Sequence, residues 1–178
     1  MPPTSPLLFE YGRDLPAFIE SYEYAQGLPW LADVARIERA WLDAYHAADV
    51  VPLSAEALVA ISPDRLADTM FVVHPATRIV RSRFAAVTIF AANRNEGAGG
   101  QIDAGTPEDA LITRPIDDVV VRHLPQGGAV FFQSLISGQS LGEAAALALE
   151  SSASFDIATN IAGMIQAGVF TAVTRGAV

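Results

Sequence analysis

The sequence predicts an α+β fold, and three observations carry this prediction. An apolar stripe at helical spacing runs through residues 30–49. Strand-like runs rich in β-branched residues lie at residues 70–83 and 110–124. Three short helical segments and a last strand-like run follow at residues 128–174. We therefore expect a helical segment over residues 1–66, packed on a small domain with an antiparallel sheet and three helices over residues 67–178.

Length and composition limit the classes of protein that this chain could represent. It has 178 residues, of which 51% are hydrophobic, enough for the core of one or two small domains. It has no Cys, which excludes disulfides, thiolate metal ligands and a Cys nucleophile. There is no run of about 18 apolar residues and no basic, apolar leader, so neither a membrane span nor a secretory signal is predicted. We expect a cytoplasmic protein with no membrane partner.

The helix expected at residues 30–49 has a continuous apolar face at 3.6-residue spacing. Its members are Trp30, Val34, Ile37, Trp41, Ala44, Tyr45 and Ala48. Glu38, His46 and Asp49 lie on one flank, where imidazole and carboxylates could bind a transition metal. No His-x3-His spacing supports such a site, so a hydrogen-bonded His between helices is favoured, and we expect no metal and no cofactor.

The middle of the chain alternates short elements. Residues 54–58 start a short helix, and residues 62–66 start a turn or another short helix. Strands are expected at residues 70–74 and 78–83. Alternation in the second strand puts Ile79, Arg81 and Arg83 on one face and Arg78, Val80 and Ser82 on the other. The alanines of residues 84–93 favour a helix.

The glycine-rich run at residues 95–105 is interpreted as a flexible loop. Its sequence contains EGAGG but lacks the Gly-Lys-Ser/Thr motif that a phosphate-binding loop requires. Strands at residues 110–114 and 119–124 follow it, and both are bounded by proline.

Three helices and a strand complete the chain. The helix at residues 128–137 should end in a left-handed turn at Gly138. Ser140 and Glu143 fit a capping box, which opens the next helix at residues 141–150.

The third helix, at residues 155–167, should stop at Gly168 before a strand at residues 169–174. This order of strands and helices is that of a small winged-helix unit.

Two segments carry a resemblance to a known family. Residues 28–53, LPWLADVARIERAWLDAYHAADVVPL, and residues 72–93, VVHPATRIVRSRFAAVTIFAAN, are the informative ones, together with ITRP at residues 112–115. With the C-terminal helices, they resemble the partner proteins encoded beside multinuclear non-heme iron oxidative enzymes. Those enzymes modify Cys-containing precursor peptides, as in methanobactin and bufferin biosynthesis. The resemblance extends over about residues 11–170, and residues 131–170 are similar to a winged-helix peptide-recognition domain.

The resemblance implies a function and its partners. It implies a non-catalytic protein, without an iron site of its own, that recruits a ribosomal precursor peptide and pairs with the iron enzyme. Members of the family carry an N-terminal helical domain that is labelled DNA-binding. The chain would begin near the end of that domain, at residues 11–19, so the DNA-binding label transfers poorly.

A peptide-recognition unit of this kind would work by β-augmentation, in which an extended peptide adds a strand at a sheet edge. The expected site is the strand at residues 119–124 with the helix that faces it, at residues 156–165. Its candidate residues are Val119, Val120, Val121, Arg122, Ile157 and Ile161. The alternative, that the apolar members are simply core residues, stays open.

Arginines form the second candidate surface. All 11 basic residues are Arg, which suits bidentate contacts with carboxylates. Contacts with an acidic ligand or with the enzyme are expected from Arg78, Arg81, Arg83 and Arg114, with Arg94 nearby. Internal pairing with the 20 acidic residues is the alternative.

Two other classes of function are less favoured. A winged-helix DNA-binding regulator should present Arg or Lys on its third helix, and residues 155–167 contain neither. A net charge of −9 also opposes binding to phosphates. For an enzyme, the sequence offers no catalytic motif, and the three histidines, His46, His74 and His123, are widely separated.

Overall fold

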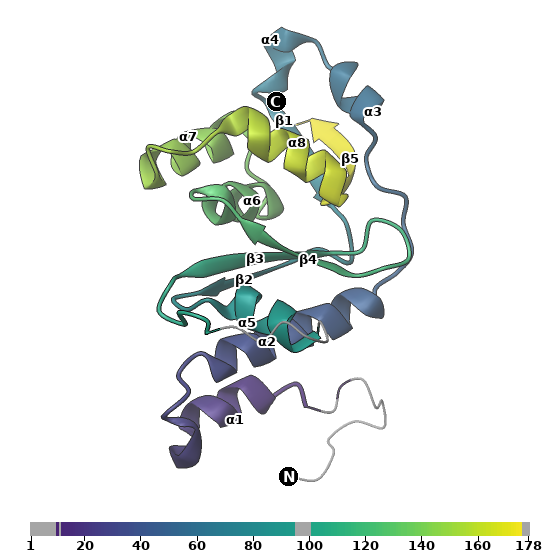
Figure 1. Ribbon diagram of the computed structural model, residues 1–178. Helices are drawn as coiled ribbons and strands as arrows, with labels where there is room; N and C mark the ends of the chain where they lie inside the picture. The colour runs from purple at the N-terminus through teal and green to yellow at the C-terminus, as the bar shows by residue number, and fades with distance from the viewer. Residues whose placement is uncertain (1–9, 11, 95–100, 176–178) are drawn as a thin grey trace.

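The computed structural model describes residue 10, residues 12–94 and residues 101–175, and these have the predicted α+β fold. Figure 1 shows the arrangement of the elements. In chain order they are α1 (Leu15–Ser21), η2 (Glu23–Ala25), α2 (Leu31–Tyr45), α3 (Ala55–Val59), α4 (Pro63–Leu66), β1 (Thr69–Val73), β2 (Arg78–Ser82), α5 (Ala86–Arg94), β3 (Glu108–Thr113), β4 (Val120–Leu124), α6 (Gly128–Ile136), α7 (Leu141–Ser151), α8 (Ile157–Ala167) and β5 (Phe170–Arg175).

The strands form two antiparallel sheets. One is the pair β1–β5, and the other has the order β2-β3-β4. The sequence placed β1 in one sheet with β2, β3 and β4, and this prediction is wrong. The backbone N–H of His74 donates to the carbonyl of Val169 at 2.9 Å, which directs β1 toward β5. Helix α6 lies between the two sheets and contacts both (Figure 1).

Two hydrophobic clusters lie on opposite faces of the three-stranded sheet. The first cluster joins α6, α7 and α8 to the β1–β5 pair, and its largest fully buried members are Phe131, Phe132, Leu135, Met164 and Phe170. The second cluster joins α2 and α5 to the other face, through Ile37, Ala44, Ala86, Phe90 and Ile112 among others. Figure 1 shows α1, α2 and α5 below the sheet and α6, α7 and α8 above it.

The division into residues 1–66 and 67–178 stays a prediction. Helix α2 shares the second cluster with β3 and α5, whereas Leu53 belongs to the first cluster. The first 66 residues therefore contribute to both clusters.

Helix α2 is shorter than the sequence predicted, because it ends at Tyr45 rather than near residue 49. Ile37 and Ala44 are fully buried, as the apolar stripe predicts, but Tyr45 is 53% exposed. Arg114 lies at the end of this helix and donates to the carbonyls of Ala44 and Ala47. The bond to Ala47 supplies a donor just past the helix C-terminus, where carbonyl groups lack helical partners, and the bond to Ala44 adds to the one from the backbone N–H of Ala47.

Local signals located the C-terminal helices correctly. The capping box is present: Ser140 Oγ accepts from the backbone N–H of Glu143, and the Glu143 carboxylate accepts from the backbone N–H of Ser140. The latter bond lowers the pKa of Glu143 below its ordinary value of 4.5. Gly138 and Gly168 follow α6 and α8 with φ of +87° and +65°, in the left-handed region that glycine adopts easily.

Two further sequence predictions concern the segment after β2. Residues 84–93 were favoured as a helix, and α5 confirms this. Of the predicted loop at residues 95–105, residues 95–100 lie outside the described residues, and residues 101–105 contain no helix or strand. None of the helices in the described parts of the chain has the length and apolar character needed to cross a membrane.

Candidate functional site

Strand β4 lies at an edge of the three-stranded sheet. Among the described residues, only β3 pairs with it, in a register that runs from Thr113 opposite Val120 to Asp109 opposite Leu124. Beyond this ladder, the recorded hydrogen bonds of β4 in the described residues come from one side chain, that of Arg122. The other edge of β4 can therefore accept a further strand.

The two faces of β4 point into different surroundings. Val119 and Val121 are half-buried and pack against the second cluster. Alternation places Val120 and Arg122 on the opposite face, together with Leu124 of the first cluster. Of the predicted peptide-binding residues, Val119 and Val121 thus have a role in the core, whereas Val120 and Arg122 face α6 and α8.

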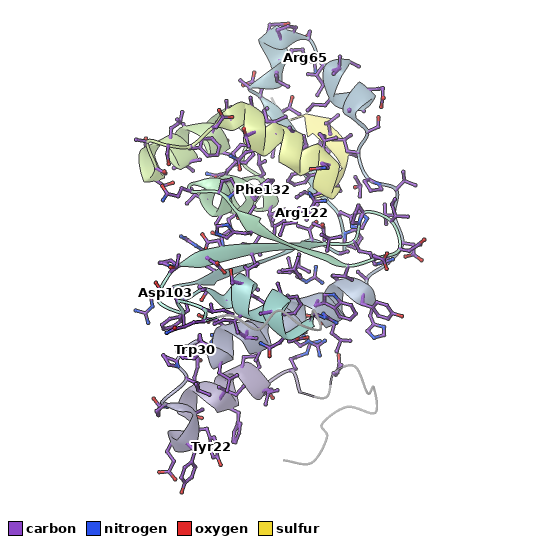
Figure 2. All side chains as sticks on the ribbon, in the orientation of Figure 1. Tyr22, Trp30, Arg65, Asp103, Arg122 and Phe132 are labelled. Carbon is purple, nitrogen blue, oxygen red and sulfur yellow. The ribbon has the colours of Figure 1, made fainter. Side chains whose placement is uncertain are left out.

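Helix α8 is connected to β4 through Arg122. The guanidinium donates from Nη1 to Gln166 Oε1 at 3.1 Å. Figure 2 labels Arg122 in the space between the three-stranded sheet and α8. On α8 itself, Ile157 is 42% exposed, and Ile161 is half-buried against the first cluster. The structure therefore brings Arg122 together with the predicted helix, but leaves Ile157 at the surface.

Three buried polar atoms on this side of the sheet have no hydrogen-bond partner among the described residues. They are Thr113 Oγ1 on β3, Arg122 Nε on β4 and Asn160 Oδ1 on α8. Thr113 and Arg122 share the sheet face that points toward the first cluster, and Asn160 is 3% exposed. Buried polar atoms normally have partners. One of these atoms lies on each of β3, β4 and α8, the elements that border the first cluster on this side of the sheet.

The N-terminus of α8 is held by a side chain. Asp156 Oδ1 accepts from the backbone N–H of Thr159 at 2.6 Å, and this bond lowers the pKa of Asp156 below its ordinary value of 3.8. Asn160 Nδ2 donates to the carbonyl of Asp156 at 2.8 Å. The capping bonds orient Asn160 and leave its Oδ1 without a donor.

Two of the four predicted contact arginines form hydrogen bonds within the protein. Arg114 is 8% exposed and binds Asp49 Oδ1 at 2.5 Å in addition to the end of α2. Arg78 donates to the carbonyls of Pro75 and Thr77 at 2.7 and 2.8 Å. Arg114 is thus buried at the end of α2, whereas Arg78 is half-buried and uses its Nη1 within its own turn.

The other two arginines lie at the end of β2 and are exposed. Arg81 forms one long ion pair with Asp109, at 3.4 Å, and its side chain is 56% exposed. Arg83 forms no recorded contact in the described part of the chain. Both line a cleft of about 1010 Å³ at this end of the sheet. Arg94 lies elsewhere, 4.4 Å from the ring centroid of Trp41.

His74 has a structural role that no local sequence pattern indicates. This residue is 2% exposed, and its Nδ1 accepts from the backbone N–H of Ala76 at 3.1 Å. Its Nε2 therefore carries the proton and donates to the carbonyl of Val50 at 2.9 Å. Thr77 Oγ1 donates to the carbonyl of Val169 at 2.9 Å. We call residues 74–78 with these partners the His74 corner.

The potential metal ligands and the histidines are dispersed in the described residues. They contain no group of three potential ligands that could hold a metal ion. Of the flank considered above, Asp49 binds Arg114. His74 is buried in its corner, whereas His123 is exposed on β4. Neither histidine lies in a recorded hydrogen bond with a hydroxyl nucleophile or a carboxylate.

No protein-family model matches the chain, and no curated protein matches it. The function is therefore inferred from the geometry of the β4–α8 side and from the resemblance described above.

Proposed function

We propose that this protein is a non-catalytic partner that recruits a ribosomal precursor peptide to a multinuclear non-heme iron enzyme. The observation that carries the proposal is the unpaired edge of β4, the strand whose Arg122 side chain contacts α8. The resemblance supplies the identity of the two partners. The proposal places the protein in the cytoplasm, where ribosomal peptides are made.

The physical basis of recruitment is strand addition. An extended peptide that runs along β4 would form main-chain hydrogen bonds with its free edge. Each such bond contributes about 1 kcal/mol net. The half-buried face of α8, including Ile161, would contact alternate side chains of the peptide.

Arg122 would supply a charged contact within this site. Its present partner, Gln166, is a neutral amide in an exposed hydrogen bond. A peptide carboxylate in the same position would form a charge-assisted bond, which is roughly twice as strong. We therefore expect Arg122 to exchange Gln166 for an acidic side chain of the peptide.

A DNA-binding regulator is not favoured by any observation on α8. Its sequence, IATNIAGMIQA, contains no Arg or Lys that could contact phosphates. The overall charge of −9 opposes such binding further.

The proposal is tested by co-expression with the candidate iron enzyme and precursor peptide, followed by size-exclusion chromatography. We expect a stoichiometric complex that captures the peptide. A second measurement compares the peptide with a copy that is N-methylated at alternate residues. The modified copy cannot donate main-chain hydrogen bonds from the methylated edge, and it should bind at least about tenfold more weakly.

The matched variants are Arg122→Gln and Arg65→Gln. Arg65 is exposed on α4, and Figure 2 shows it at the far end of the molecule from the three-stranded sheet. Arg122→Gln should weaken peptide binding, whereas Arg65→Gln should not. A protein that stays monomeric and binds neither partner would refute the recruitment function.

A further inference from the structure

A cleft of about 1010 Å³ opens at the end of the three-stranded sheet. Its lining includes Arg81 and Arg83 from the end of β2, Asp109 from β3, and His123 and Leu124 from the end of β4. The register places Arg81, Asp109 and Leu124 in one row across the sheet. We call this cavity the end cleft.

The carboxylates of the end cleft are already bound within the protein. Asp33 accepts from Ser82 Oγ at 2.7 Å and from Arg36 at 2.6 Å. Glu20 pairs with Arg36 at 2.5 Å, and this contact is the main cause of the raised pKa of Arg36. Asp109 pairs with Arg81 at 3.4 Å. The acidic groups of the lining therefore have cationic or hydroxyl partners.

The basic groups of the end cleft are less well satisfied. Arg83 and His123 are both exposed, and neither has a recorded partner in the described residues. Arg81 is more than half exposed, and its one contact with Asp109 is at the long end of hydrogen-bond distances. The two guanidinium groups that remain for a ligand donate hydrogen bonds and accept none, and their planar geometry suits carboxylate oxygens.

We infer that the end cleft binds carboxylate side chains of an acidic segment of the recruited peptide, with Arg83 as the principal contact and Arg81 as the second. This inference rests on the proposed function and specifies the peptide that the site would take. The cleft begins where β4 ends, at His123 and Leu124. A peptide paired with β4 reaches the cleft when it continues past the end of that strand.

The charge of the whole protein makes this contact selective. With a net charge of −9, the protein repels an acidic peptide in general. Binding must then come from the few places where cations lack internal partners. The preferred peptide has a strand-forming segment for β4 and an acidic segment next to it.

The test uses a fluorescently labelled precursor peptide and a second version in which every Asp and Glu is replaced by Asn and Gln. Binding to the full chain is measured by fluorescence anisotropy for the wild type, Arg83→Gln and the double variant Arg81→Gln/Arg83→Gln. Arg65→Gln is the matched control, because it removes an equally exposed arginine far from the cleft. Thermal unfolding confirms that each variant is folded.

We expect Arg83→Gln to weaken binding of the acidic peptide about fivefold, as for one partly exposed ion pair. The double variant should weaken it further, and Arg65→Gln should leave it unchanged. The neutral version of the peptide should bind all four proteins equally.

Two other results have different meanings. If the wild type binds the acidic peptide and Arg83→Gln and the double variant both bind it equally well, the end cleft is not the acidic subsite, while the recruitment function stands. If the wild type binds neither version of the peptide, the inference and the proposed function both fail.

Discussion

The His74 corner and the β4–α8 side use similar polar residues in opposite ways. In the corner, both ring nitrogens of His74, the hydroxyl of Thr77 and the guanidinium of Arg78 bind carbonyls or N–H groups of the same chain. Beside β4, Thr113, Arg122 and Asn160 each keep one buried polar atom without a partner. Satisfied polar groups stabilise a fold, whereas unsatisfied ones cost free energy unless something else binds them. The difference separates a structural motif from a candidate binding site.

The largest effect should follow from breaking the corner. His74→Ala removes a buried ring and leaves the Val50 carbonyl and the Ala76 N–H without partners. The free energy of unfolding should fall by about 3 kcal/mol, because a cavity and two unsatisfied groups add their costs. Urea denaturation followed by circular dichroism measures this loss. A fall of less than about 1 kcal/mol would contradict the structural role of the corner.

A smaller effect separates two arginines on neighbouring strands. Arg114→Met leaves the carbonyl of Ala47 without its donor, removes one of the donors to Ala44 and breaks the ion pair with Asp49, and it should lower the free energy of unfolding by about 2 kcal/mol. Arg122→Met loses only the exposed bond with Gln166 and removes the unpartnered Nε, so its effect should stay below about 1 kcal/mol. The same denaturation series compares them. Equal losses in the free energy of unfolding would contradict the view that Arg114 stabilises the fold more than Arg122 does.

The smallest effect concerns pH and the caps of α7 and α8. Their carboxylates, Glu143 and Asp156, have pKa values below the ordinary 4.5 and 3.8, because backbone N–H groups donate to them. A lowered pKa in the folded state gives stability that is present above the ordinary value and is lost as pH falls through the folded value. The double variant Glu143→Gln/Asp156→Ser keeps polar caps without this titration.

The melting temperatures of the wild type and of this double variant, measured from pH 7 down to pH 3, test the effect. The advantage of the wild type should be constant above about pH 5 and shrink below it. An advantage that grows toward low pH would show that the caps act by another mechanism.

Much of the secondary structure could be predicted, because its signals are local. The capping box joins residues three positions apart, and a glycine ends α8 through its own backbone freedom. The alternation in β2 was also correct, since Ile79 packs against the first cluster and Val80 against the second. The cap and the stop involve groups within a few residues of each other, and the alternation follows from the two-residue period of a strand.

The pairing of strands could not be predicted in the same way. Four residues separate β1 from β2, a length that also fits a hairpin between them. The structure instead pairs β1 with β5, about 100 residues later in the chain. That pairing depends on the position of α6 between the sheets and on the hydrogen bond from His74 to Val169. No local sequence pattern predicts either feature.

The candidate site was partly predictable. The sequence identified β4 and the helix opposite it, but alternation alone did not show which face of β4 meets which cluster. It also grouped four arginines as one surface. Arg114 instead binds the end of α2, which lies beside it in the folded protein. Arg78 instead donates to a carbonyl of its own turn.

By itself, the sequence determined the α+β class, the locations of most helices and strands, and the caps and stops that bound them. These features depend on propensity, periodicity and hydrogen bonds between near neighbours. Only the tertiary structure decided which strands pair, which arginines are buried and where polar atoms lack partners. Those outcomes depend on contacts between segments far apart in the chain. The role of an arginine or a histidine is set by the carbonyl or carboxylate group that lies beside it in the folded protein.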